Sequence, residues 1–264
     1  MIEEDRKIVY VVSRVHTSYF LLLALCTRIY IYHNKSYKNP IMALQNCKLT
    51  YFNIPGRGEA ARIALFIGNI KFVDEHVQFS QWKEMKSSTP WDSLPILTLS
   101  DGTVIAQQRA ILRLIGKETG LYPDDAIAAA KVDEVMDAVE EVIAAVKMAG
   151  KGLPQDKMEE ARRVVCAEGG AVFRILKNVD DRLAAKSGCY AVGDTLTIVD
   201  FLIFCIVNTL VSGHFDGVPA DAHAGFDNIG ALCRAVRSCP AVCKWYDCLD
   251  ATIFVPECFL KTIS

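Results

Sequence analysis

The sequence has no excess of charge of either sign and no cysteine pattern typical of a metal site. Its 264 residues include 29 Lys and Arg against 31 Asp and Glu, a formal net charge of -2. This balance provides no basic surface to neutralise a phosphate backbone, so we expect no nucleic-acid partner. None of the ten cysteines forms a CxxC pair, and no histidine lies at metal-ligand spacing, so we expect no metal.

The sequence also has little need of disulfides. The chain is long enough, and with 52% hydrophobic residues apolar enough, to bury a core of its own. We therefore interpret the cysteines as reduced thiols of an intracellular, cytoplasmic protein. A disulfide within the crowded run "CRAVRSCPAVCKWYDC" is the alternative, although helical spacing explains that run without a bond.

The amino-terminal apolar run "YFLLLALC", residues 19–26, is too short to span a bilayer. Arg14 and Arg28 flank it, and the start of the chain lacks the positive bias of a signal peptide. A weak signal or anchor and an ordered extra segment are alternatives. We favour an extension, residues 1–44, that is not part of the fold, with Met42 as a sensible start. Membrane association is expected only if this segment is retained.

From Cys47 the pattern predicts a small mixed sheet. "KLTYF" and "IKFVDEHV" alternate as strands, and between them Gly56 to Gly68 has helical periodicity, with Gly68 as its C-cap. A short polar helix is expected from about Ser80. The order of predicted elements up to residue 123 is β-α-β-α-β-β-α.

The second half of this sheet is predicted to be a hairpin followed by a helix. Asp101 and Gly102 form a two-residue turn between "ILTL" and "TVI". A helix begins near Gln107, places Ile111 and Ile115 inward, and ends by Gly120.

After residue 123 the strand pattern stops and helices are predicted. "VDEVMDAVEEVIAAV", residues 132–146, has apolar residues at helical spacing. A long helix is expected over 156–186, loosened at Gly169 and Gly170 and closed by Gly188. An almost wholly apolar helix follows within 193–210, and shorter helices continue to Asp250.

Thr197 and Asp200 predict how this apolar helix begins. They form a T-x-x-D capping box, in which each side chain bonds a backbone N–H of the first turn. This pair is a folding device, and we assign it no catalytic role.

Two single residues raise the question of function. Tyr51 lies at the carboxyl end of the first strand, where α/β folds place ligands, and Pro95 begins a strand. From the residues alone, a buried tyrosine bonded to a backbone carbonyl is the favoured interpretation of Tyr51. An ordinary trans proline is likewise favoured at Pro95.

Taken together, "KLTYFNIPGRGEAARIAL", "LPIL", "DGTVIAQQRAILRLI" and the Thr197/Asp200 box resemble the glutathione transferase family, most of all its sigma class. The resemblance implies a thioredoxin-like domain over 46–123 and an all-α domain over 128–264, which would hold the electrophile and the dimer contacts. It implies glutathione as co-substrate without a metal, a role in detoxification and a homodimer.

The resemblance also implies a role for Tyr51. The glutathione thiol has a cysteine-like pKa near 8.5, so little of it is ionised at neutral pH. One charge-assisted hydrogen bond of about 1.5 to 3 kcal/mol could lower that pKa by one to two units. Tyr51 would donate this bond, and Arg57 would add positive potential beside the sulfur.

Other residues would hold the tripeptide. Lys86 would meet the glycyl carboxylate, although a surface lysine beside a half-buried Trp82 is the alternative. The Leu94 backbone would pair with the cysteinyl residue, freed by a cis bond to Pro95. The implied glutathione site consists of Phe52, Arg57, Trp82, Lys86, Ser93, Leu94, Pro95, Gln107 and Gln108, with Asp137 or Glu141 as described below.

Two positions depart from the family pattern. Serine is usual where Gln108 stands, and glutamine is usual where Ser93 stands. Gln107 and Gln108 begin a helix whose amino end favours the γ-glutamyl carboxylate, but glutamine caps a helix poorly. We therefore expect glutathione affinity weakened by about 1 to 2 kcal/mol, the scale of one hydrogen bond.

Asp133, Asp137 and Glu141 form a carboxylate stripe at i+4 spacing on the first long helix. The stripe could simply be a solvated face. In a dimer packed about this helix, Asp137 or Glu141 could instead reach the ammonium group of the ligand bound to the partner. The sequence does not choose between these two acids.

Three functions are compatible with these residues. The first is conjugation of the glutathione thiolate to electrophilic apolar substrates. The second is a glutathione-dependent isomerase, similar to prostaglandin synthases, in which the thiolate attacks and later leaves. The third is a non-catalytic glutathione-binding protein, motivated by Gln108 and Ser93. We favour the first.

Overall fold

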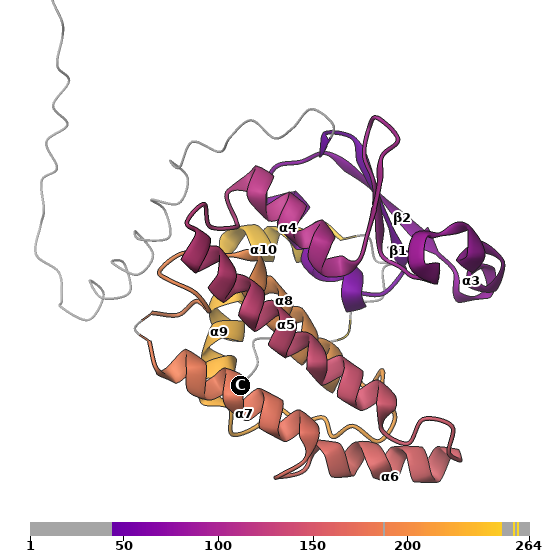
Figure 1. Ribbon diagram of the computed structural model, residues 1–264, viewed down its shortest axis with the longest axis vertical. Coiled ribbons are helices and arrows are strands. Elements are labelled where there is room, and N and C mark those ends of the chain that lie inside the picture. Colours follow the sequence, from indigo (N-terminus) through magenta and orange to yellow (C-terminus); the bar gives the residue numbers. More distant parts are fainter. Residues whose placement is uncertain (1–43, 187, 250–255, 257, 259–264) are drawn as a thin grey trace, which may run out of the picture. The chain divides into compact units, whose positions relative to one another are not determined.

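The computed structural model describes residues 44–186, 188–249, 256 and 258 (Figure 1). The expected extension, residues 1–44, lies outside these residues except for Leu44, as do Met42 and Cys26. No helix in the described part of the chain is long and apolar enough to cross a membrane. The nine cysteines within it are all free thiols.

The first half is a four-stranded sheet with three α-helices and three short 3-10 helices. In chain order the elements are β1 (Cys47–Phe52), η3 (Gly56–Gly58), α2 (Glu59–Ile67), β2 (Phe72–Val77), α3 (Phe79–Met85), η4 (Lys86–Ser88), η5 (Pro90–Asp92), β3 (Ile96–Thr98), β4 (Val104–Ala106) and α4 (Gln108–Thr119). This order confirms the predicted β-α-β-α-β-β-α sequence of elements.

The strand order is β2-β1-β3-β4, with β1 parallel to β2 and antiparallel to β3. Parallel neighbours need a crossover, and α2 provides it. The pleat turns Leu49 and Tyr51 of β1 to the buried face, where they are 0% and 7% exposed. Tyr51 therefore lies at the carboxyl end of its strand, as the sequence predicts, and that strand is central in the sheet.

The hairpin between β3 and β4 differs from the prediction in its loop. Gly102 has the expected positive φ of 88°, but Asp101 does not, and the Gly102 N–H bonds the Leu99 carbonyl. The Leu99 N–H also donates to the Thr103 carbonyl at 2.8 Å, so residues 100–102 form a three-residue loop instead of the predicted two-residue turn. A single left-handed residue after an ordinary turn is the usual geometry of such loops.

Gly68 ends α2 as predicted, but for a different physical reason. Its φ of -70° is open to any residue, and Asn69 takes the positive φ instead. A Cβ on Gly68 would lie 2.2 Å from Cγ2 of Thr119 on α4. Glycine is needed here because α2 and α4 approach closely, not because the chain turns left-handed.

The second half of the described chain is helical. Its elements are α5 (Ala126–Met148), α6 (Gln155–Cys166), α7 (Ala171–Ala184), α8 (Ile198–Val211), α9 (Asp227–Arg237) and α10 (Pro240–Asp247). Figure 1 shows the sheet, in indigo and purple, on one side and these helices on the other. The apolar stripe predicted on the first long helix is buried in α5, from Val132 to Val146. The two-part fold, a thioredoxin-like sheet followed by an all-α region, is thus confirmed.

The prediction of one long helix over 156–186 is wrong, because the structure has two helices there. α6 ends at Cys166, and α7 begins at Ala171 and ends at Ala184, before Gly188. Gly169 has a φ of 78°, and a Cβ on Gly170 would lie 2.4 Å from the Val165 carbonyl. The two glycines thus break the helix instead of loosening it.

The capping box at the start of α8 is confirmed. Asp200 accepts from the Thr197 N–H at 2.7 Å, and the Thr197 side chain accepts from the third residue of the helix. Asp200 is fully buried and also accepts from the Ala191 N–H at 2.6 Å. The box therefore ties the preceding loop to the apolar helix as well as capping it.

The two halves are joined through α2, which packs against α8 and α10. The Trp245 indole N–H of α10 donates to Oε1 of Glu59 at 2.8 Å, and both residues are buried. Glu59 also pairs with Arg62 at 3.2 Å, and Arg62 with Asp74 of β2 at 2.9 Å. A buried charge needs such partners, so this network fixes the helical half against the sheet.

Candidate active site

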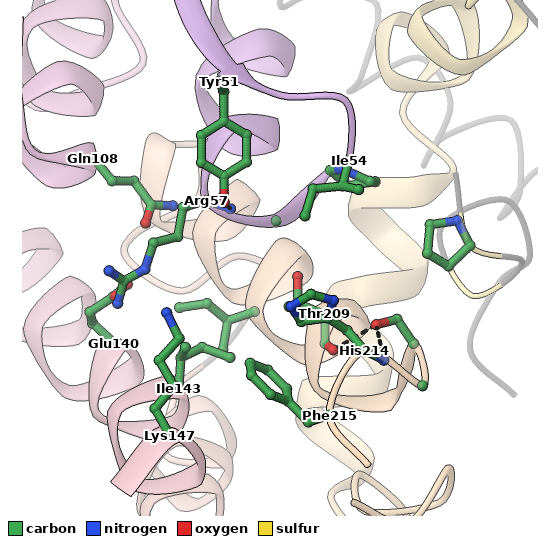
Figure 2. Close-up of a pocket in the computed structure, with 16 residues that line it drawn as sticks. Tyr51, Ile54, Arg57, Gln108, Glu140, Ile143, Lys147, Thr209, His214 and Phe215 are labelled. Atoms are coloured by element: carbon green, nitrogen blue, oxygen red, sulfur yellow. Dashed lines mark hydrogen bonds and ion pairs between the residues drawn. The ribbon is translucent and has the colours of Figure 1, made fainter. Parts of the chain in front are cut away.

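A pocket of about 180 Å³ lies between the carboxyl end of β1 and helices α5 and α8 (Figure 2). The sheet half contributes Tyr51, the loop that follows it, and Gln108. The helical half contributes residues of α5, of α8 and of the segment after α8. The lining consists of Tyr51, Ile54, Pro55, Gly56, Arg57, Gln108, Glu140, Ile143, Lys147, Ile206, Thr209, Ser212, Gly213, His214, Phe215 and Pro256.

The Tyr51 hydroxyl points toward the loop at the pocket wall. Its oxygen accepts a hydrogen bond from the backbone N–H of Arg57 at 3.0 Å. The interpretation from the residues alone, a phenol bonded to a backbone carbonyl, is therefore wrong: the partner is a donor. Within the described residues no acceptor is found for the proton of the hydroxyl, so this proton is available to a ligand.

Two glycines make this arrangement possible. A Cβ on Gly56, whose φ is 42°, would lie 2.8 Å from the Tyr51 hydroxyl oxygen. A Cβ on Gly58 would lie 2.6 Å from the Tyr51 ring. Both contacts are too close for any other residue, so the "PGRG" segment can wrap around the ring only with glycine at these positions.

Arg62, 3% exposed, holds the same loop from beneath. Its guanidinium donates to the carbonyl oxygens of Ile54 at 2.8 Å and Phe52 at 3.1 Å. The Arg62 guanidinium also lies 5.7 Å from the centroid of the Tyr51 ring. Arg62 thus ties the backbone of this loop to α2, the helix to which it belongs.

Burial raises the pKa of Tyr51 above its usual value of 10, although the Arg57 hydrogen bond and the charges of Arg57 and Arg62 oppose this. The phenol therefore keeps its proton at neutral pH. It can donate a hydrogen bond to an anion, and it cannot act as a base there.

The Arg57 guanidinium forms an ion pair with Glu140 of α5. Its Nε and Oε2 of Glu140 are both buried without a protein partner among the described residues. The sequence predicts positive potential from Arg57, but Glu140 offsets much of that charge. What Arg57 offers to the Tyr51 oxygen is its backbone N–H.

Gln107 and Gln108 begin α4 as predicted. Gln107, the N-cap, has a φ of 72°, which is uncommon for a residue other than glycine and persists only where the surrounding structure fixes the backbone. Gln108 is 7% exposed, lines the pocket, and its Oε1 has no partner among the described residues. An unpaired buried acceptor of this kind fits a ligand that brings a donor.

Other predicted residues pack around Tyr51 without lining this pocket. Trp82 of α3 packs with Tyr51 and Leu94 in one cluster, and its ring lies 5.7 Å from that of Phe52. Phe52 stacks on Phe79 at 4.5 Å, so its side chain supports α3.

The remaining members of the predicted glutathione site flank Leu94 or lie on the surface. The Leu94–Pro95 bond is cis, contrary to the preference from the residues alone and in agreement with the family resemblance. Leu94 lies outside the paired residues of the β1–β3 ladder, and the half-buried Ser93 precedes it. Lys86 begins η4 and is exposed.

The two predicted acids lie apart from this pocket in the described chain. Asp137 is exposed and pairs with Arg109 of α4, and Arg113 lies 3.8 Å away. Glu141 lines a second pocket of about 140 Å³ between α5 and α7. Asp133 also pairs with Arg113, at 2.7 Å, so arginines of α4 face the carboxylate stripe.

Sequence reasoning missed the helical wall of the pocket. Glu140, Ile143 and Lys147 stand at i, i+3 and i+7 on α5, so they share one face of the helix. That spacing is visible in the sequence and could have identified them. His214 and Phe215 follow α8 in a segment with no regular pattern, and nothing in the sequence singles them out.

The chain is similar to known proteins in both sequence and structure. Residues 47–117 match the family model of the glutathione S-transferase N-terminal domain, and residues 147–248 match that of the glutathione S-transferase C-terminal domain. A solved structure of the glutathione S-transferase from Ascaris lumbricoides superimposes with a TM-score of 0.63 at 27% identity, covering 79% of this chain and 100% of that one.

Two relatives match almost their whole length. Hematopoietic prostaglandin D synthase of Gallus gallus is 30% identical over 202 residues, 76% of this chain and 96% of the relative. Glutathione S-transferase 1 of Ascaris suum is 30% identical over 203 residues, 75% of this chain and 94% of the relative. On these matches, the chain belongs to the glutathione S-transferase family.

Proposed function

We propose that the protein forms the thiolate of glutathione beside Tyr51 and transfers it to an electrophilic carbon of an apolar substrate. The observation that carries this proposal is the Tyr51 hydroxyl, which accepts from the Arg57 N–H at 3.0 Å at the wall of the pocket. Its own proton is then directed to a bound sulfur. A bond to the anion lowers the thiol pKa, and so raises the fraction ionised at neutral pH.

The reaction needs no redox step. With 1-chloro-2,4-dinitrobenzene, the sulfur–carbon bond forms, chloride leaves with the bonding electron pair, and the thiol proton goes to solvent. The apolar side chains Ile143, Ile206 and Phe215 would hold the ring of such an acceptor. Because apolar surface of the substrate would be buried against these side chains, the pocket favours substrates of low polarity.

The remaining glutathione contacts are part of the same proposal. Lys86 and Trp82 would bind the glycyl end, Leu94 with Pro95 and Ser93 the cysteinyl backbone, and Gln107 with Gln108 the γ-glutamyl end. The orphan Oε1 of Gln108 supports a donor, such as the ligand ammonium, at that end. Phe52 would contribute indirectly, by packing against the ring of Trp82.

The oligomeric state of the protein and its class within the family are also proposals. We propose a homodimer in which Asp137 or Glu141 crosses to the partner's ligand, a sigma-class relationship, and a cytoplasmic role in detoxification. We propose the domain limits 46–123 and 128–264, with residues 1–44 as an extension.

Capture on immobilised glutathione, followed by a 1-chloro-2,4-dinitrobenzene assay on the eluate, tests binding and turnover together. We expect retention, elution by free glutathione and conjugation above the uncatalysed rate. Retention without turnover of this or other neutral electrophiles would reject the transferase and leave the non-catalytic binder and the isomerase described below. Failure to bind glutathione would reject both.

A second candidate function is a glutathione-dependent isomerase, which the similarity to prostaglandin D synthases favours. In an isomerase the thiolate attacks and then leaves, so glutathione is regenerated. Measurement of total free thiol separates the two reactions, because conjugation consumes one thiol per product and isomerisation consumes none.

A further inference from the structure

Lys147 differs from the other charged residues of the pocket because it lacks a counter-charge. It extends from α5 beside Ile143 into the pocket, on the helical side (Figure 2). Glu140 is the one acid among the described lining residues, and Arg57 already pairs with it. No carboxylate of the described chain lies within ion-pair distance of the Lys147 amine.

Most cations around the site are, in contrast, matched by acids. Arg62 pairs with Glu59 and Asp74, and Arg113 pairs with Asp133. The two α4 arginines face the stripe on α5, and Arg57 faces Glu140. Lys147 thus differs from Arg57, the arginine of the pocket lining, in having no acid partner among the described residues.

The surroundings of Lys147 leave its charge without compensation. Although the residue as a whole is exposed, removal of its amine from water lowers its pKa, the Arg57 charge lowers it further, and Glu140 opposes them. Burial also lowers the pKa of His214, as do the charges of Lys147 and Arg162, although the charge of Asp216 opposes them. Arg57 and Glu140 offset one another, and the pocket retains the positive charge of Lys147.

We propose that this pocket selects electrophiles that carry a carboxylate, which pairs with Lys147 while the reactive carbon faces the sulfur held at Tyr51. The apolar residues Ile143, Ile206 and Phe215 would hold the part of the molecule between these two ends. The inference rests on the proposed transferase function. It assigns Lys147 as the residue that determines specificity.

A suitable probe is an α,β-unsaturated ketone that exists as an acid and as a neutral isostere. Ethacrynic acid and its primary amide meet this requirement. Addition of glutathione forms a sulfur–carbon bond, breaks the carbon–carbon π-bond, and places the thiol proton on the adjacent carbon, so no oxidant is needed. The carboxylate takes no part in the chemistry, so a difference between the probes reports recognition.

The experiment compares kcat/KM for both probes in the wild-type protein, Lys147→Met and Lys151→Met. Lys151 lies three residues beyond the end of α5, outside the pocket lining, and its loss changes the net charge equally. We expect the wild type and Lys151→Met to prefer the acid about tenfold, the scale of one charge-assisted bond. Lys147→Met should lose this preference, with its rate on the amide unchanged within about twofold.

Equal rates on acid and amide in the wild type would overturn the inference. So would an acid preference that survives in Lys147→Met, or an equal loss on both probes, which would indicate a structural role. If no variant turns over either probe, calorimetry with the saturated analogues of both probes decides the matter. Tighter binding of the acid that depends on Lys147 would then support the inference while the transferase proposal fails, and equal binding would reject the inference.

Discussion

The backbone N–H of Arg57 donates to the hydroxyl oxygen of Tyr51 at 3.0 Å, and the loop that makes this possible contains two glycines packed against the tyrosine ring. A donor at the oxygen polarises the phenol, so its proton is a better donor toward a sulfur anion. The same bond opposes the increase in pKa that burial causes at Tyr51.

Replacement of Tyr51 with Phe should slow conjugation of 1-chloro-2,4-dinitrobenzene. A loss of one to two pKa units of thiol stabilisation corresponds to a decrease of about tenfold to a hundredfold in kcat/KM near pH 6.5. The defect should shrink above pH 9, where glutathione ionises without help. Steady-state rates over pH 6 to 9.5 provide the measurement.

Tyr122→Phe is the matched control, because Tyr122 is also buried, at 9% exposed, and lies outside the pocket lining. It should retain wild-type rates across the pH range. A Tyr51→Phe variant with full activity at pH 6.5 would show that another group stabilises the thiolate.

Gln108→Ser should strengthen glutathione binding. Gln108 is the first residue of α4, so serine there would keep a side-chain donor beside the backbone N–H groups of the first turn while leaving room for the γ-glutamyl carboxylate. We expect Kd to fall about fivefold to thirtyfold, equivalent to about 1 to 2 kcal/mol. Calorimetric titration with glutathione measures the effect. An unchanged or weaker affinity would mean that the glutamine amide itself binds the tripeptide.

Much of this fold follows from periodicity, and much of the site does not. Apolar residues alternate along the strands around Tyr51, and they recur at helical spacing in the buried stripe of α5. Each spacing fits only one kind of element. The break at Gly169 and Gly170 was not predicted, because the sequence does not show that a carbonyl of α6 lies against Gly170. Such close approaches depend on tertiary packing.

The site divides in the same way. The family resemblance of short motifs points to Tyr51 and Gln108, both of which line the pocket, whereas Glu140 becomes relevant only when α5 packs against the loop of Arg57. The role expected of Arg57 changed with that contact. A pair 83 residues apart in sequence has no local signature, and without homologous sequences it can be found only in three dimensions.

Trp245→Phe should destabilise the protein by loosening the junction between its two halves. Phenylalanine retains aromatic packing near Phe66, whose ring centroid lies 5.5 Å from that of Trp245, but it cannot donate to Glu59. Loss of a buried hydrogen bond to a carboxylate should cost about 1.5 to 3 kcal/mol of unfolding free energy. Urea denaturation followed by circular dichroism measures this change.

Trp91→Phe is the control for that experiment, because Trp91 is 78% exposed and also loses an indole. Its unfolding free energy should change by less than about 0.5 kcal/mol. Equal midpoints for the two variants would indicate that the Trp245–Glu59 bond contributes nothing to the junction.

Asp200 should give the protein a distinctive dependence of stability on pH. Burial raises its pKa from 3.8 to about 6, although three hydrogen bonds from Ala191 and Thr197 oppose the shift. Between about pH 4 and 6 the folded state therefore binds more protons at this site than the unfolded state does. The contribution of Asp200 to the unfolding free energy is fully present below the unfolded pKa and is lost as the pH rises through 6, by an amount on the order of 3 kcal/mol.

Asp200→Asn removes the titration, so the wild type minus variant difference in unfolding free energy should decrease as the pH rises from 4 to 7. Asp125→Asn is the control, because Asp125 also caps a helix, at the start of α5, but at an exposed position. The wild type minus Asp125→Asn difference in unfolding free energy should not decrease between pH 4 and 7. Denaturation at half-unit intervals of pH measures all three proteins. A wild type whose advantage over Asp200→Asn grows with pH would mean that the hydrogen bonds outweigh desolvation and that the folded-state pKa lies below the unfolded one.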